Sequence, residues 1–245
     1  MIPQALKNFP KKAIELPEDF RNIYNTHYKK NRRGETKTTS LSMKMERWLH
    51  KKVANDVKDE GKSTLEIGAG TLNQLNYEPK VDSYDIVEPF KELYENSPQL
   101  SRIGHIYNDI SDIDPKKRYQ RITSVATFEH ILDLPAVVAK SVLLLRQNGS
   151  LRVSIPNEGT FMWKLGTMFT GAEFKKMYGL DYQILLKHEH VNTAAEIEAV
   201  LKYFFKNTKT EVFGINKRIA FYMYICCKKP NIDKAKEYLK LRNIN

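Results

Sequence analysis

Cysteine is scarce in this 245-residue chain, and long apolar runs are absent. The two cysteines, Cys226 and Cys227, are adjacent, and adjacent residues pair only in a strained ring, so we expect reduced thiols in a buried strand. No run approaches the ~18 apolar residues that a membrane-spanning helix needs. Residues 1–7 lack the apolar core of a secretory signal. These absences predict a cytoplasmic protein without a transmembrane segment.

The chain has fewer acidic than basic residues. It contains 29 aspartates and glutamates and 40 lysines and arginines, which gives a formal net charge of +11. Such a balance admits nucleic acid, anionic lipid surfaces and acidic metabolites as partners. The basic residues are dispersed along the chain, which is typical of a solvated face, so nucleic acid is not expected as a partner. The exception is the basic cluster at 29–33, near Tyr24 and Tyr28, which is suited to clamping an anionic group.

A strand that runs into a glycine turn is the most informative feature that is present. Residues 64–67 have a buried strand pattern, and Gly68 and Gly70 follow at once. The third glycine of the dinucleotide fingerprint is replaced by Asn73, and no Gly-Lys-Ser/Thr ending follows Gly70. Glu88 ends the next apolar run, 18 residues after Gly70, where a carboxylate can accept both hydroxyls of a ribose. The pattern predicts a nucleotide-like cofactor, and the alternative is a tight turn without a ligand.

Apolar runs alternate with helix-length segments through the middle of the chain, which predicts an α/β fold with a parallel sheet and helices on both faces. Ligands bind such sheets at the carboxyl ends of the strands. A capping-box pattern from Thr193 to Glu196 opens a helix that ends at Phe204 or Phe205. The predicted strands are residues 64–67, 84–88, 103–107, 121–127, 150–155, 210–213 and 218–227, with a turn at 214–216, and the other main helices are 42–58 and 135–145.

Five segments, in order along the chain, resemble the motifs of class I S-adenosylmethionine-dependent methyltransferases. Residues 65–71 look like the first motif, E/D-x-G-x-G-T, and residues 85–89 look like the second, whose acid binds the ribose. Residues 108–110 look like the third motif, where an acid faces the adenine amine. Residues 122–131 look like the fourth, a strand followed by E-H-I/L, and residues 144–151 resemble the turn before the fifth strand. The resemblance covers about residues 45–229.

The resemblance implies a Rossmann-like seven-stranded sheet, mostly parallel with an antiparallel last strand, and S-adenosyl-L-methionine as the cofactor. The chain departs from the family pattern at Leu72, where many members have glycine, and at 147–148, where Gln-Asn replaces a Pro-Gly pair. For Asp109, an alternative role is to cap the turn at 111–112. The residues that the resemblance places at the cofactor are Glu66, Gly68, Ala69, Gly70, Glu88, Pro89, Asp109, Ile110 and Thr127.

Three regions are expected: an N-terminal extension at 1–40, a methyltransferase domain at 41–229 and a basic helix at 230–245. An apolar insertion at about 156–191 follows the fifth strand, where family members place substrate-binding segments. We expect it to cap the acceptor; the alternatives are a peripheral contact with a membrane and an ordinary helix packed on the core.

Three histidines are candidates for a general base, from which a hydroxyl acceptor would benefit. His130 follows the fourth strand, and His188 and His190 end the insertion. A structural role at a helix start is the alternative for His130. No metal is expected, because a spacing of two is poor on a helix and no third ligand group is evident.

Two absences disfavour base methylation of nucleic acids. Residues 126–129 lack the N/D-P-P-Y/F segment of amino-methylating DNA and RNA enzymes, and they lack the cysteine of cytosine-C5 enzymes. The sequence therefore predicts an enzyme that methylates a small molecule or a saccharide, with oxygen as the expected acceptor atom. The alternative is a noncatalytic module of the same fold that binds nucleic acid or an anionic surface.

Overall fold

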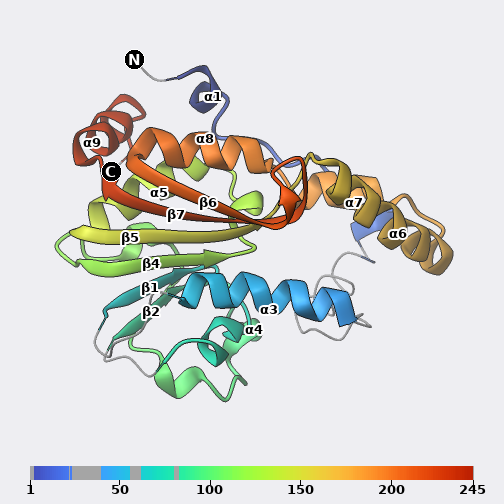
Figure 1. Cartoon of the computed structure of the whole chain (residues 1–245), viewed down its shortest axis with the longest axis horizontal. Helices are drawn as coiled ribbons and strands as arrows, with labels where there is room; N and C mark the ends of the chain where they lie inside the picture. Colours follow the sequence, from blue (N-terminus) through green and yellow to red (C-terminus); the bar gives the residue numbers. More distant parts are fainter. Residues whose placement is uncertain (1–2, 22, 24–39, 56–61, 80–82, 245) are drawn as a thin grey trace.

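The computed structural model describes residues 3–21, 23, 40–55, 62–79 and 83–244 (Figure 1). The basic cluster at 29–33, most of the polar stretch before residue 40 and the end of the helix predicted over 42–58 lie outside these residues. Within the described ranges, no helix is both long enough and apolar enough to cross a membrane.

One mixed sheet forms the centre of the molecule. In the described residues its strands are β1 (Thr64–Ile67), β2 (Tyr84–Val87), β3 (Ile106–Tyr107), β4 (Tyr119–Val125), β5 (Leu145–Pro156), β6 (Phe205–Asn216) and β7 (Ile219–Pro230). They lie in the order β3-β2-β1-β4-β5-β7-β6. The pairs among β1 to β5 are parallel, and β7 lies antiparallel between β5 and β6. The predicted fold class is confirmed, because the antiparallel strand is the last one.

Helices cover both faces of this sheet. The helices in the described ranges are α1 (Gln4–Lys7), α3 (Ser40–Ala54), α4 (Lys91–Tyr94), α5 (Leu134–Leu144), α6 (Phe161–Tyr178), α7 (Tyr182–Glu189), α8 (Ala194–Phe204) and α9 (Ile232–Leu241), with short 3₁₀ turns η1 (Asn73–Asn76), η2 (Leu100–Arg102), η3 (Ile110–Asp112) and η4 (Phe128–His130). α3 packs on β4, β5 and β7, whereas α8 packs on β6, β7 and α5 from the other face. Figure 1 shows α6 and α7 together beyond the ends of the strands.

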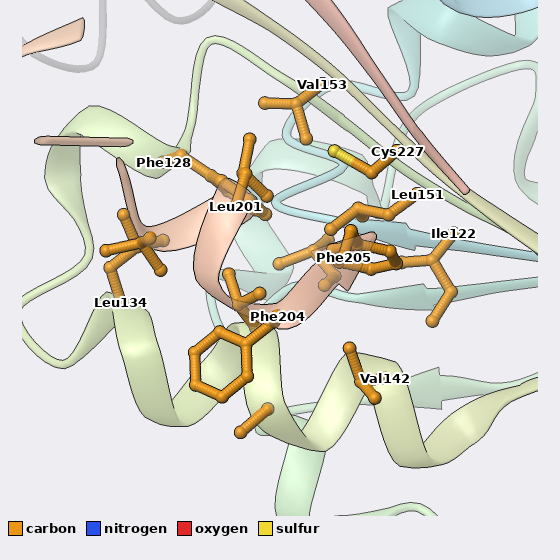
Figure 2. Packing of buried hydrophobic residues seen from close by; sticks show 14 of the residues in the cluster. Ile122, Phe128, Leu134, Val142, Leu151, Val153, Leu201, Phe204, Phe205 and Cys227 are labelled. Atoms are coloured by element: carbon orange, nitrogen blue, oxygen red, sulfur yellow. The ribbon is translucent and has the colours of Figure 1, made fainter. Parts of the chain in front are cut away.

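The main hydrophobic cluster lies between the sheet and the layer of α5 and α8, as Figure 2 shows. Ile122 of β4 and Leu151 of β5 meet Val142 of α5 and Phe204 of α8, and all four side chains are fully buried. Alternate strand residues point to opposite faces, so the strands supply apolar side chains to this layer at every second position. Cys227 is buried in the same cluster, the environment predicted for it.

Two buried arginines join the opposite face of the sheet to the C-terminal end of α3. Arg121 of β4 donates from Nη2 to the carbonyl of Val53 at 3.1 Å, and Arg152 of β5 donates from Nε to the same oxygen at 2.7 Å. Arg152 also donates from Nη2 to the carbonyl of Lys52 at 2.8 Å. The last carbonyls of a helix have no partner inside it, so these arginines satisfy the end of α3. Arg121 is paired in addition with both carboxylate oxygens of Glu78, each at 3.0 Å.

Two boundaries of the predicted hairpin are wrong. β6 begins at Phe205, directly after α8, rather than at Thr210, and the turn lies at 217–218 rather than at 214–216. Gly214 instead marks a shift in the register of β6 against β7, a common role for glycine inside a strand. The predicted strand at 103–107 is reduced to β3, because residues 103–105, which follow η2, have no regular secondary structure.

The first part of the chain packs against two distant regions. Leu6 and Phe9 lie in the main hydrophobic cluster. Leu16 and Phe20 form a second cluster with Phe174 of α6 and with Leu185 of α7. The segment before residue 22 therefore connects the core to the predicted insertion. The predicted C-terminal helix is observed as α9, which packs on α5.

Candidate active site

The glycine turn after β1 presents bare main chain at the carboxyl edge of the parallel strands. Gly68 and Gly70 have φ angles of 72° and 51°, the left-handed region that glycine adopts without strain. A Cβ on Gly68 would lie 2.3 Å from Cγ2 and Oγ1 of Thr127, so this position is closed to any side chain. A Cβ on Gly70 would meet no atom within 4 Å. The turn is thus tightly packed against Thr127 at Gly68 and is open to the surrounding space at Gly70.

Leu72 occupies the position where the resembling family often has glycine. Its φ is 65°, so the backbone keeps the glycine-like conformation although a branched side chain is present. The Leu72 side chain is fully buried in a cluster with Leu75, Tyr84 and Ile86. Burial of this size typically contributes about 2 kcal/mol, which offsets the roughly 1–2 kcal/mol of backbone strain.

Glu88 links the turn to the end of β2. One carboxylate oxygen, Oε2, accepts the backbone N–H of Gly70 at 2.8 Å, and Oε1 accepts the N–H of Phe90 at 3.1 Å. A carboxylate accepts more than one hydrogen bond at each oxygen, so these bonds orient the group and leave capacity for further donors. The acid predicted to bind a ribose is therefore held at the edge of the turn.

Two cavities meet at the turn and share Gly68, Thr127 and His130 in their linings. The smaller cavity, of about 370 Å³, is lined by Glu88, Pro89, Phe90, Asn108, Asp109, Ile110, Ile131 and Val137, among others. The larger, of about 490 Å³, includes Glu66, Ala69, Gly70 and His190. The structure thus brings all nine predicted cofactor residues to one continuous pair of cavities.

Asp109 has the capping role considered for it. Its Oδ1 accepts the N–H of Ser111 at 2.8 Å, and its own N–H donates to Asp112, which completes a capping box on η3. The same residue lines the smaller cavity. The turn that it caps keeps Asp109 and Ile110 at the cavity wall.

Glu66 is a buried carboxyl on β1 whose Oε2 accepts the hydroxyl of Tyr84 at 2.8 Å. Burial raises the pKa of Glu66 to about 8; the bond from Tyr84 opposes this, and the nearby carboxylates of Glu78 and Glu88 add to it. The group therefore holds its proton near neutral pH in this state. A cation beside it would favour the ionised form.

We expect Glu66→Gln to stabilise the fold at pH 8 and to change little at pH 5. The unfolded carboxyl releases its proton near its ordinary pKa of 4.5, while the folded one keeps it to about pH 8. Between these two pKa values the unfolded state binds fewer protons than the folded state. The free energy of unfolding of the wild type therefore falls by up to about 1.4 kcal/mol for each unit by which the pH rises. Urea unfolding at several pH values measures this, with the exposed Glu95→Gln as the control. Parallel stability curves for wild type and Glu66→Gln would contradict the pKa.

The three candidate histidines occupy different places. His130, on η4, lines both cavities, and its Nδ1 donates to the carbonyl of Glu189 at 2.8 Å. A carbonyl only accepts, so the proton sits on Nδ1 and Nε2 is the basic nitrogen of the neutral ring. His190 packs edge to face against His130, with ring centroids 4.8 Å apart. His188 lies outside both linings, with Nδ1 2.5 Å from the carbonyl of Ile14.

His190 is held in a negative surrounding. Its Nδ1 lies 2.9 Å from Oε2 of Glu158, and its ring stacks on Trp163 with centroids 5.6 Å apart. Burial alone would lower the pKa of His190, but the carboxylates of Glu158, Glu129 and Glu189 outweigh it and raise the pKa above its usual value. In the described part of the chain, no group of three or more His, Cys, Asp or Glu is placed to hold a metal ion.

For the rest of the larger cavity, the sequence predicted the insertion at about 156–191 as a cap but did not identify most of the individual lining residues. The residues that line it away from the glycine turn include Glu46, His50, Glu129, Trp163, Tyr182, Glu189 and Tyr222. They come from α3, η4, α6, α7 and β7, so only the fold brings them together. One signal was present: Glu46 and His50 lie one helical turn apart, beside the apolar stripe of α3.

Strain is present at the end of β4 as well. Ala126 has a φ of 49°, and its N–H donates to the carbonyl of Ser154 at 2.8 Å. A non-glycine residue in this region is uncommon, and such residues gather at functional sites. The turn directs Thr127 beneath Gly68, where its hydroxyl donates to the Gly68 carbonyl at 3.3 Å.

Comparison with known proteins indicates the family of this chain. A family model described as a methyltransferase domain matches residues 40–202, more than half of the chain. A search of the curated proteins found no match.

Several solved structures share this fold at low identity. One is an S-adenosylmethionine-dependent methyltransferase from Thermotoga maritima, described as a possible histamine N-methyltransferase, with a TM-score of 0.54, 16% identity and coverage of 86% of this chain and 98% of that one. Another is the plantazolicin methyltransferase BpumL in complex with a triazolic desmethylPZN analog and SAH, with a TM-score of 0.57, 13% identity and coverage of 86% of this chain and 93% of that one. A third is an O-methyltransferase family protein from Burkholderia thailandensis, with a TM-score of 0.51, 10% identity and coverage of 78% of this chain and 57% of that one.

Proposed function

The chain belongs to the methyltransferase domain family, and we propose that it transfers a methyl group from S-adenosylmethionine to a small-molecule acceptor. S-adenosylmethionine is the cofactor of this family. The observation that carries the proposal is the pair of cavities joined at the glycine turn, with Glu66 in the lining of the larger one and Glu88 and Asp109 in the lining of the smaller one. An elongated ligand with a nucleoside at one end and a cationic amino acid at the other matches this shape and charge.

The residues present fit the cofactor. The open space above Gly70 is a cradle that any side chain would fill, and Gly70 lines the larger cavity. In our proposal, Glu88 accepts the ribose hydroxyls, and Asp109 and Ile110 border the adenine. Glu66 and the turn at 68–70 receive the methionine end, where the low dielectric of a buried site strengthens the attraction between a cation and a carboxylate.

In our proposal, the acceptor and the reacting methyl group meet near Thr127 and His130, which line both cavities together with Gly68. When bound, the cofactor supplies an activated methyl group. The chain must align a nucleophile behind that group and exclude water. We assign His130 as the base that takes the proton of the acceptor, because its Nε2 is the basic nitrogen. His190, which contacts the His130 ring, is a second candidate, and His188 has no role in this proposal.

We propose the same division of the chain as the sequence suggests, with residues 41–229 as the catalytic domain between an extension at 1–40 and a basic helix at 230–245. The insertion at about 156–191 is the proposed acceptor cap, since Trp163 and Tyr182 of α6 and α7 line the larger cavity. A hydroxyl of a small molecule or saccharide is one acceptor that suits a histidine base. A cytoplasmic location and a peripheral membrane contact of α6 stay predictions.

Glu88→Ala is expected to weaken binding of S-adenosylmethionine and S-adenosylhomocysteine by more than about 100-fold, because two hydrogen bonds to a charged acceptor, each ~1.5–3 kcal/mol, are lost and ~1.4 kcal/mol corresponds to a factor of ten. Calorimetric titration of both nucleotides into wild type and variant measures this. Glu92→Ala, an exposed glutamate four residues along on α4, is the matched control and should bind as wild type does.

Equal affinity in wild type and Glu88→Ala would refute the ribose assignment. Absence of binding to folded wild type would overturn the enzymatic proposal. It would favour a noncatalytic module, for which nucleic acid and anionic lipid vesicles would be the next ligands to titrate.

A further inference from the structure

The acceptor side of the larger cavity carries the opposite charge to the molecule as a whole. The chain has a formal net charge of +11, with 40 basic residues. Among the described residues that line this cavity there is no lysine or arginine, but there are four glutamates: Glu46, Glu66, Glu129 and Glu189. Glu66 belongs to the proposed cofactor end, so three carboxyl groups remain around the acceptor.

These three groups come from separate elements and surround the space. Glu46 lies on α3, one turn before His50, with its side chain 53% exposed at the rim. Glu129 is buried on η4, with Oε1 3.9 Å from Nε2 of His130. Glu189 ends α7. The carboxylate of Glu158, which is paired with the ring of His190, neutralises the positive charge of that ring when it is protonated. The net charge of the cavity therefore stays negative when His190 is protonated.

Aromatic rings complete the lining. Trp163, Tyr182 and Tyr222 lie on α6, α7 and β7. Burial, with Glu189 and other neighbours adding, raises the pKa of Tyr182 to about 12. Burial, with Glu129 and Glu46 adding, raises the pKa of Tyr222 to about 12. Both phenols therefore stay neutral, and aromatic faces attract cations in a desolvated site.

From the convergence of these carboxylates and aromatic rings on one cavity that lacks lysine and arginine, we propose that the acceptor is an organic amine, methylated on nitrogen. The inference rests on the proposed function and names the substrate class of the same site. A carboxylate or phosphate acceptor would be repelled by three glutamates. A neutral hydroxyl compound would gain little from them, since burying a carboxyl group without a charged partner is unfavourable.

The step balances with the residues at hand. An amine enters as an ammonium ion beside Glu129, and one proton passes to Nε2 of His130. The nitrogen lone pair then forms the bond to the methyl carbon while the carbon–sulfur bond breaks and its electron pair remains on sulfur. The products are a methylated ammonium ion and neutral S-adenosylhomocysteine, and the proton on His130 leaves to solvent.

The test compares amines with uncharged molecules of the same shape. Two pairs are titrated by calorimetry into the protein saturated with S-adenosylhomocysteine: 2-phenylethylamine with 2-phenylethanol, and tryptamine with tryptophol. We expect the amine of at least one pair to bind about tenfold tighter than its alcohol, the effect of one favourable charge contact of ~1.4 kcal/mol. Phenylacetate, the anion of the first series, should not bind measurably.

Variants in which one glutamate is replaced by neutral glutamine test which carboxyl groups cause the preference for the amine. Glu129→Gln is expected to remove the preference for the amine while leaving the alcohol unchanged. Since Glu129 is buried, Glu46→Gln at the rim is a second variant that does not disturb packing, and it should weaken the amine about threefold. Glu173→Gln, exposed on the same α6 helix that carries Trp163, is the control and should have no effect.

The outcomes separate the two proposals. If S-adenosylhomocysteine does not bind, the proposed function fails. If it binds but neither amine is preferred over its alcohol, or phenylacetate binds best, the amine inference is overturned and the methyltransferase proposal stands. Mass spectrometry of the reaction with S-adenosylmethionine should show one methyl group added to the bound amine and none to the alcohol.

Discussion

Arg121→Met is expected to lower the free energy of unfolding by about 3–5 kcal/mol. Arg121 is 1% exposed and pairs with both oxygens of Glu78, whose side chain is fully buried. Removing the guanidinium leaves the carboxyl group without its counter-charge and leaves the Val53 carbonyl with one donor fewer. The remaining bond to Glu78, from the Gln74 amide at 2.7 Å, does not replace a positive charge.

Urea or guanidinium unfolding measures this loss, and the double variant Arg121→Met/Glu78→Met tests its origin. If the cost arises from a lone buried charge, the double variant should recover part of the stability, since an apolar pair avoids that cost. Arg118→Met, on the exposed segment before β4, is the matched control and should change stability by less than ~0.5 kcal/mol. A loss below ~1 kcal/mol for Arg121→Met would contradict the expectation.

Gly68→Ala is expected to destabilise the fold by about 2–5 kcal/mol, which combines left-handed backbone strain of ~1–2 kcal/mol with overpacking of ~1–3 kcal/mol. The new methyl group would lie 2.3 Å from Thr127 atoms. Gly70→Ala is the matched comparison, because its φ is also positive but its Cβ would meet no atom within 4 Å. It should cost only the backbone strain.

The two glycines should also differ in what they do to binding. In Gly70→Ala the methyl group enters the cradle above the turn, so we expect near-normal folding and a large loss of S-adenosylmethionine affinity. Thermal unfolding and calorimetric titration of both variants separate these effects. Comparable stability of the two variants would contradict the tight contact between Gly68 and Thr127.

The convergence of the proposed cofactor residues could be predicted from the sequence because it depends on local features. The glycine turn and Glu88 follow a strand directly, Asp109 is two residues beyond the end of β3, and parallel strands end at one edge of a sheet. Whichever helices pack around them, these residues come together. The main-chain freedom of Gly68 and Gly70 is likewise a property of the residue itself.

The acceptor side depends on tertiary packing. Glu46, Glu129, Trp163 and Tyr222 are far apart in sequence, and each fits an ordinary helix or strand pattern where it stands. Their convergence follows from how α3, α6 and β7 pack around the end of the sheet. The boundaries of β6 were predicted wrongly for a similar reason. The first part of this strand is partly exposed and contains lysines, so it has no apolar pattern, and it is held in the sheet by pairing with β7.

The packing of the first residues has a consequence for the order in which the molecule forms. Lys11 donates to the carbonyl of Val191 at 2.7 Å and pairs with Glu196 at 2.6 Å, positions 180 and 185 residues away. During synthesis these partners emerge long after Lys11, so the amino-terminal segment must wait undocked while the sheet is made. Contacts of such long range are closed late. The proposed acceptor cap, whose helices α6 and α7 pack against Leu16 and Phe20, is therefore completed only once most of the chain has left the ribosome.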